Sequence, residues 1–110
     1  EYIALFPNVM IGLHIDHFFV LWLEPLAVNK TKEHMQMYYI GEESANGEKL
    51  KELRRKNVRF WKDVILEDVN AIEGMQEGRS SPAYKGGNFS PIMDKPIHQF
   101  HKWIASNLIV

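Results

Sequence analysis

The 110-residue chain contains no cysteine, and this absence removes several kinds of chemistry from consideration. Disulfides, zinc–thiolate sites and cysteine-ligated iron–sulfur clusters all require cysteine thiols. The sequence also has no run of about 18 apolar residues, the length that a membrane-spanning helix needs. Its 13 basic and 14 acidic residues form no long run of one sign. We therefore expect neither a membrane protein nor the basic surface of a nucleic-acid-binding protein.

Short motifs of common enzymes are also missing. There is no GxGxxG, no phosphate-binding loop and no Gly-x-Ser-x-Gly elbow. No secretory segment is visible, so a cytoplasmic location is the plain expectation. What the chain does have is 45% hydrophobic and 12% aromatic residues, enough for one domain over residues 1–110. Because it opens directly in strand-like sequence without an initiator methionine, we interpret it as part of a longer protein.

The pattern of apolar residues predicts an α+β fold, in which an antiparallel sheet is packed by a long helix and a C-terminal helix. Runs rich in β-branched and aromatic residues predict strands at 9–14, 18–26 and 34–40, joined by short breaks. Helical spacing takes over from about residue 47 to residue 77, with Gly78 as a stop. Pro96 suits the first turn of the last helix. Three strands make a thin sheet, so we expect an exposed edge that pairs in a homo-oligomer or continues in a missing part.

Asp68 is the most unusual residue of the predicted long helix, because it lies within an apolar stripe. At about 100° per residue, six apolar side chains fall within roughly 60° of it. They are Trp61, Val64, Ile65, Ala71, Ile72 and Met75. Glu73 points to nearly the opposite side. A carboxylate on such a face loses hydration, so we expect Asp68 to be neutralised, paired with Arg or His, or bound to a metal.

Histidines form two candidate pairs, and for both a structural role is the simpler interpretation. His14 and His17 would converge only if the chain turns between them, since residues three apart on a strand face opposite sides. His98 and His101 share one face of the last helix but would need a further ligand. Aromatic residues could line a cavity for an apolar or cationic ligand, or simply fill the core. These are Trp22, Tyr38, Tyr39, Phe60, Trp61, Phe89, Phe100 and Trp103.

A spaced motif begins at Asp68 and its neighbour: ED-x4-E-x2-Q-x-G-x2-SP, within VILEDVNAIEGMQEGRSSPAYKGGNFSP. Before it stands the strand run PNVMIGLHIDHFFVLWLEPLAVNKTKEHMQMYYIG, and HQFHKWIASNL follows near the end. Together these segments resemble the C-terminal part of the catalytic domain of Rieske-type non-haem iron oxygenase α subunits, the ring-hydroxylating dioxygenase family. The resemblance covers nearly the whole chain.

The resemblance implies an incomplete helix-grip (START-like) catalytic domain. It implies that Asp68, five residues before Glu73, is the carboxylate of a facial triad whose other ligands are two histidines. It further implies that Trp61, Val64 and Ile65 line the substrate pocket. The resemblance implies that the intact oxygenase hydroxylates an aromatic substrate, as in aromatic catabolism, or a quaternary-ammonium substrate. It would use O2 and NAD(P)H-derived electrons, which a reductase or ferredoxin passes on.

The resemblance also implies that this chain is inactive alone. The family's Rieske domain, with its Cys and His ligands for a [2Fe–2S] cluster, has no counterpart in these residues, and neither histidine pair matches the family's iron-binding motif. No tightly bound Fe(II) is therefore expected here. Two other classes stay open: a stand-alone helix-grip module that binds a small apolar ligand, and an assembly role in which the sheet pairs with another copy.

Overall fold

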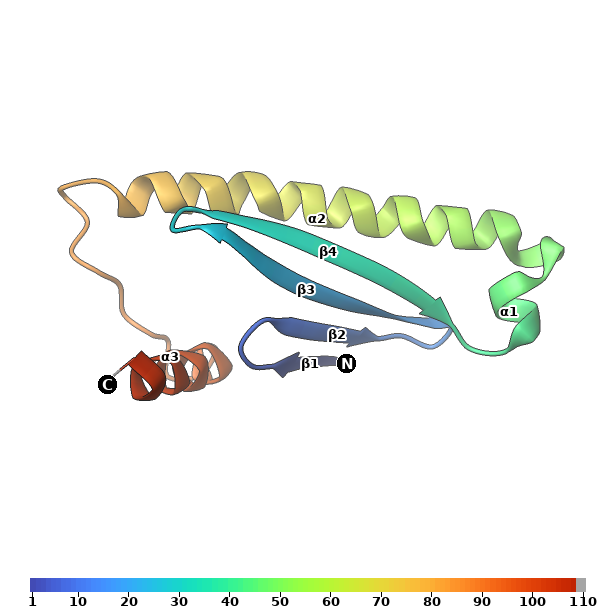
Figure 1. The fold of residues 1–110 in the computed structure, drawn as a ribbon, viewed down its shortest axis with the longest axis horizontal. Helices are drawn as coiled ribbons and strands as arrows, with labels where there is room; N and C mark the ends of the chain where they lie inside the picture. The colour runs from blue at the N-terminus through green and yellow to red at the C-terminus, as the bar shows by residue number, and fades with distance from the viewer. Residues whose placement is uncertain (109–110) are drawn as a thin grey trace.

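A four-stranded antiparallel sheet carries a long helix on one face and a shorter helix at one end (Figure 1). The computed structural model describes residues 1–108. The strands form a meander in chain order: β1 (Tyr2–Leu5), β2 (Val9–Leu13), β3 (His17–Ala27) and β4 (Lys30–Tyr39). Then follow α1 (Glu42–Asn46), the 3-10 turn η1 (Glu48–Leu50), α2 (Lys51–Arg79) and α3 (Lys95–Leu108). The predicted α+β class is confirmed.

The sheet has one strand more than predicted. Residues 2–5 pair with β2, and Tyr2 lies opposite Gly12. The predicted break at 27–33 is also wrong, because β4 begins at Lys30 and continues the hairpin opposite the end of β3. Polar residues there indicate a loop by composition, but both faces of this hairpin end are exposed, so apolar alternation is not required. Gly78 does not stop α2, which ends one residue later, at Arg79.

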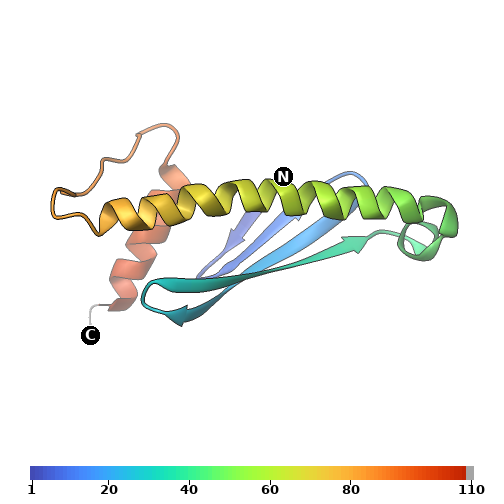
Figure 2. The ribbon, with the colours of Figure 1, turned by 90° about the horizontal axis from the view of Figure 1, so that it is seen from above.

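The small core lies where α2 crosses the middle of the sheet (Figures 1 and 2). Strand alternation directs His17, Phe19 and Leu21 to the same face, and these side chains are the buried ones among residues 1–108. The ring of Phe19 lies 4.6 Å from that of Trp61 on α2, measured between ring centroids. This contact between β3 and α2 holds the two layers together.

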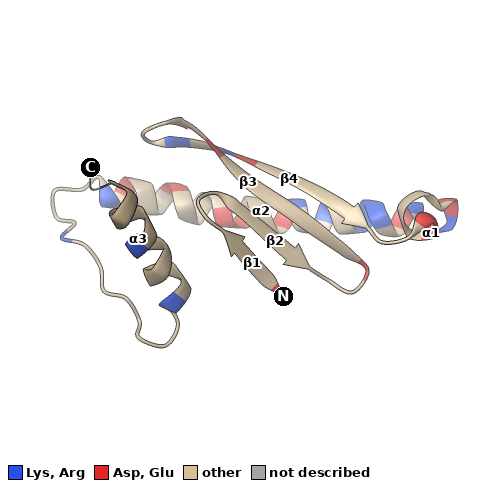
Figure 3. Ribbon diagram, turned by 60° about the horizontal axis from the view of Figure 1, so that its bottom comes forward, with Lys and Arg blue, Asp and Glu red and all other residues tan. Residues whose placement is uncertain are grey.

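Much apolar surface stays uncovered within the described part of the chain. The radius of gyration is 17.5 Å, whereas a compact domain of about 100 residues has roughly 13 Å. Ile72 and Met75 on α2 are more than half exposed. Figure 3 shows the sheet from its other side, where no helix of residues 1–108 crosses β3 and β4. Exposed apolar surface on this scale is typical of an element that packs against further protein.

The charges of α2 lie in two blocks. Lys and Arg dominate residues 51–62, and Asp and Glu supply all the charges of residues 63–77 (Figure 3). This order opposes the helix dipole, which favours acidic side chains at the N-terminus. The stability of α2 must therefore come largely from its packing on the sheet. In the described residues, no helix is long and apolar enough to cross a membrane.

Gly12 on β2 is required by the close approach of the Phe19 ring. A Cβ atom at Gly12 would overlap three atoms at the end of that ring, and the ring cannot swing away easily because it packs on Trp61. We expect Gly12→Ala to lower the free energy of unfolding by about 1–3 kcal/mol in urea denaturation. Gly74→Ala in α2 is the control: nothing lies within 4 Å of the added Cβ, so helix propensity should raise stability by up to about 1 kcal/mol. Equal effects at the two glycines would contradict the overlap.

Candidate functional site

A chain of hydrogen bonds joins α2 to the turn between β2 and β3. The indole Nε1 of Trp61 donates to Nε2 of His17 at 2.9 Å. Nδ1 of His17 lies 2.7 Å from Oδ1 of Asp16, and Asn57 Nδ2 donates to Oδ2 of the same carboxylate at 3.2 Å. The bond with His17 is the main reason why the pKa of Asp16 is lowered. We call these four residues the clamp.

The chain does turn between His14 and His17, and the two imidazoles converge. The His14 N–H donates to the His17 carbonyl at 3.0 Å, and the rings stack with centroids 4.8 Å apart. His17 nonetheless has no lone pair left for a metal, because one ring nitrogen accepts from Trp61 and the other donates to Asp16. Nε2 of His14 is buried without a hydrogen-bond partner among the described residues. Burial, followed by repulsion from His17, lowers the pKa of His14 and keeps it neutral.

Asp68 lies on the side of α2 that faces the sheet, but it is exposed, so the expected burial is wrong. The apolar residues that share its face in the next turns, such as Ile72 and Met75, are exposed as well. The helix continues past the sheet's core, and nothing in the described part of the chain covers that end of the stripe. Glu33 stands on the helix-facing side of β4, where partial desolvation and then the negative charge of Asp68 raise its pKa. The two carboxylates therefore face the same space.

The three residues expected to line a substrate pocket lie in different surroundings. Trp61 belongs to the clamp and packs against His14 and Phe19. Ile65 borders a hollow of about 480 Å³ between β4 and α2, together with Met35, Gln36, Met37, Tyr39, Val58, Lys62 and Leu66. Val64 is half-buried and is not among those lining residues. Of the three residues, only Ile65 borders this hollow.

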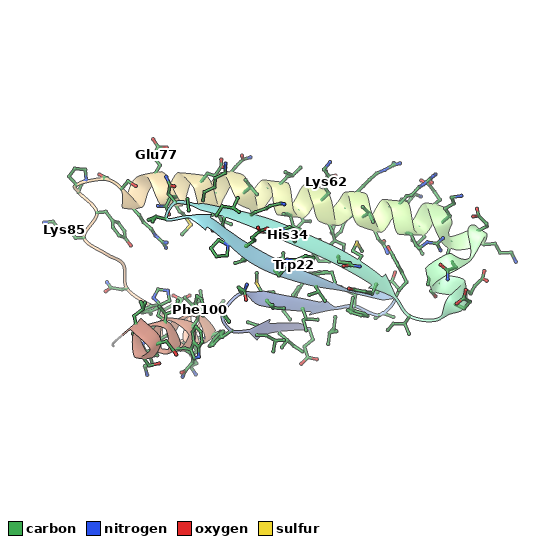
Figure 4. All side chains as sticks on the ribbon, in the orientation of Figure 1. Trp22, His34, Lys62, Glu77, Lys85 and Phe100 are labelled. Atoms are coloured by element: carbon green, nitrogen blue, oxygen red, sulfur yellow. The ribbon has the colours of Figure 1, made fainter. Side chains whose placement is uncertain are left out.

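Two further aromatic–histidine clusters lie away from Asp68. His34 on β4 stacks on Trp22 of β3, with centroids 4.8 Å apart, and the two side chains lie together in Figure 4. Nε2 of His34 lies 2.6 Å from a carboxylate oxygen of Glu24, and this bond lowers the pKa of Glu24. In the second cluster, Phe89 lies within about 5 Å of both His98 and His101, measured between ring centroids. Over the described residues, neither cluster belongs to a group of three or more side chains that could hold a metal ion.

The described residues do not form an iron site by themselves. Over residues 1–108, no group of three or more His, Asp or Glu side chains is placed to hold a metal ion. His17 is hydrogen-bonded to Trp61, which precedes Asp68 by seven residues on α2. At 1.5 Å per residue, Trp61 and Asp68 are about 10 Å apart along the helix axis. His14 and His17 are therefore not partners of Asp68. Sequence reasoning also missed Asn57, Asp16 and Glu33, which only the packing of α2 on the sheet brings into play.

Comparison with known proteins identifies the class. The family described as "Ring hydroxylating alpha subunit (catalytic domain)" matches residues 1–109, nearly the whole chain. The chain therefore belongs to the catalytic-domain family of ring-hydroxylating oxygenase α subunits. The family resemblance inferred from the spaced acidic motif is confirmed. No solved structure matches the chain.

The individual relatives are choline monooxygenases. The chain is 28% identical to "Choline monooxygenase, chloroplastic" of Spinacia oleracea over 107 residues, which are 97% of the chain and 24% of that protein. The same name and identity apply in Amaranthus tricolor, again over 97% of the chain and 23% of the relative. The chain thus spans about a quarter of the length of these relatives. Their names place those proteins in chloroplasts, so a cytoplasmic location stays a prediction for this chain.

Proposed function

We propose that the chain forms the C-terminal part of an iron-dependent oxygenase catalytic domain, in which Asp68 supplies the carboxylate ligand. The position of Asp68 is the observation that carries this: it follows the sheet-packed Trp61 by seven residues and so lies on the same side of α2. It has no hydrogen bond or ion pair among the contacts of residues 1–108. Its place in the acidic motif of the family supports the same role. The two histidine ligands would come from outside the described residues.

The substrate we propose is a quaternary-ammonium compound, since the relatives are named for choline oxidation rather than for an aromatic substrate. The parent enzyme would use O2 and NAD(P)H-derived electrons, delivered by a reductase or ferredoxin through the [2Fe–2S] cluster of a Rieske domain. This chain would be inactive alone. Its open sheet face and exposed apolar residues support packing against the rest of such a domain or against a second copy.

Titration with Fe(II) under anaerobic conditions tests this proposal. One carboxylate cannot hold the metal tightly, so calorimetry on the chain alone should show no 1:1 complex at micromolar concentrations. Asp68→Asn should behave like the wild-type chain in that experiment. A stoichiometric micromolar complex would show that the chain holds a complete ligand set, and the proposal would then be wrong.

A second candidate function rests on the hollow between β4 and α2. Its volume of about 480 Å³ and its Met, Tyr, Val, Ile and Leu lining suit a small apolar ligand. Ile65→Trp would fill this space. Saturable binding of an apolar fluorescent probe by the wild-type chain, lost in Ile65→Trp and kept in the exposed Ile72→Trp, would favour a stand-alone binding module over the oxygenase fragment.

A further inference from the structure

The hydrogen-bond chemistry of the clamp determines the tautomer of His17. A tryptophan indole N–H can donate but cannot accept. Because Trp61 Nε1 points at Nε2 of His17 from 2.9 Å, that nitrogen must carry the lone pair. The proton of the neutral ring is then on Nδ1, where the Asp16 carboxylate accepts it at 2.7 Å. A buried neutral imidazole with one defined tautomer therefore connects the helix to the turn.

The clamp attaches α2 to the turn by hydrogen bonds from two of its residues, Asn57 and Trp61, which lie one helical turn apart. Two anchors on the same face prevent a helix from rolling about its axis. Asp68 follows Trp61 by seven residues, which at 100° per residue is 20° short of two full turns. The direction of the Trp61 side chain and the direction of Asp68 are thus tied together by the stiffness of the helix.

We infer that Asp16, His17, Asn57 and Trp61 are positioning residues, which hold Asp68 toward the sheet only while His17 is neutral. The inference rests on the proposed function for the role given to Asp68, but the rotation of α2 can be measured without any metal. It assigns a purpose to a buried histidine and an aspartate that the iron site does not use.

Protonation of His17 would break the helix end of the clamp. The added proton would go to Nε2, so that two N–H groups would face each other across 2.9 Å. The bond to Asp16 would survive and gain charge. Several titratable or charged groups surround the ring or its neighbours from the turn, β4, α2 and β1. They are His14, Asp16, Tyr39, Arg54, Tyr2 and the amino group of Glu1. Only Asp16 among them is negative at neutral pH, and it accepts the hydrogen bond from Nδ1 of His17.

Two measurements on the full chain test the inference. Nitrogen chemical shifts of His17 report its tautomer, and exchange of the indole N–H protons reports whether Trp61 is bonded. Because the chain has no native cysteine, spin labels at Val28→Cys in the β3–β4 turn and Ile72→Cys on α2 report the distance between helix and sheet. Both labelled side chains are well exposed.

We expect the Nδ1–H tautomer, indole exchange at least tenfold slower for Trp61 than for Trp103, and a narrow distance distribution that broadens once acid protonates His17 and removes its acceptor nitrogen. Trp61→Phe removes the donor but keeps an aromatic ring, and should give the broad distribution at every pH. His17→Gln keeps an acceptor but cannot titrate, so its distance distribution should stay narrow at every pH. Trp103→Phe, the matched control in α3, should behave like wild type.

Several outcomes would overturn the inference. They are an Nε2–H tautomer, fast exchange at Trp61, or a narrow distribution in Trp61→Phe. If Trp61→Phe loses helix content, His17→Gln decides, because a pH-dependent distance in that variant contradicts the clamp. None of these readouts depends on iron, so the role of Asp68 as a ligand can fail while the clamp stands.

Discussion

In the intact oxygenase that we propose, Asp68→Ala should leave less than about a tenth of the wild-type mononuclear iron bound. Under the proposed assignment the variant removes one of three protein ligands, and changes in outer-shell residues alone already cost metal sites about 10–100-fold in affinity. Iron per mole of protein, measured by elemental analysis after anaerobic purification, is the direct readout. Turnover of the proposed quaternary-ammonium substrate should fall in parallel.

Glu73→Ala is the matched control for Asp68→Ala. Both carboxylates are exposed residues of α2 and belong to the same spaced motif, but Glu73 lies five residues on and points to the other side of the helix. It should keep its iron. Normal iron content in Asp68→Ala would exclude the residue as a ligand. Equal losses in both variants would point to damage to the helix, and would contradict the assignment as well.

The long helix was predictable from sequence because its apolar spacing extends over many turns, and its end was off by only two residues. The first strand could not be predicted, because its four residues show little alternation of apolar and polar side chains. Only its pairing with β2 defines it. The start of β4 could not be predicted because its residues are polar. A solvent-exposed hairpin end needs hydrogen bonds between backbones and no apolar side chains.

The helical wheel identified which residues share a face with Asp68 but could not say what covers that face. Burial depends on a neighbouring element, and none among the described residues covers Ile72 and Met75, which are more than half exposed. The clamp was out of reach for a related reason. Its helix residues lie 41 and 44 positions from their partners in the β2–β3 turn, so no local spacing marks them. The single local sign was the Asp-His pair at the turn itself.

The same dependence on one contact between layers predicts a large loss of stability in Phe19→Ala. Phe19 is 6% exposed and is one of two buried apolar side chains among residues 1–108. Its ring contacts Trp61, with His14 and Tyr2 beside it. Truncation removes the ring and leaves a cavity under α2, so the free energy of unfolding should fall by about 3–5 kcal/mol. Domains are stable by only about 5–15 kcal/mol, and urea denaturation followed by circular dichroism will register the shift.

Phe60→Ala tests whether that loss comes from burial rather than from the substitution itself. Phe60 precedes Trp61 on α2 but is 59% exposed, so the same truncation should cost less than about 1 kcal/mol. A difference of several kcal/mol between the two variants would locate the stability of the fold in the β3–α2 contact. Similar losses at both positions would mean that α2 is held to the sheet along its length, and that the clamp and Phe19 are not its main attachment.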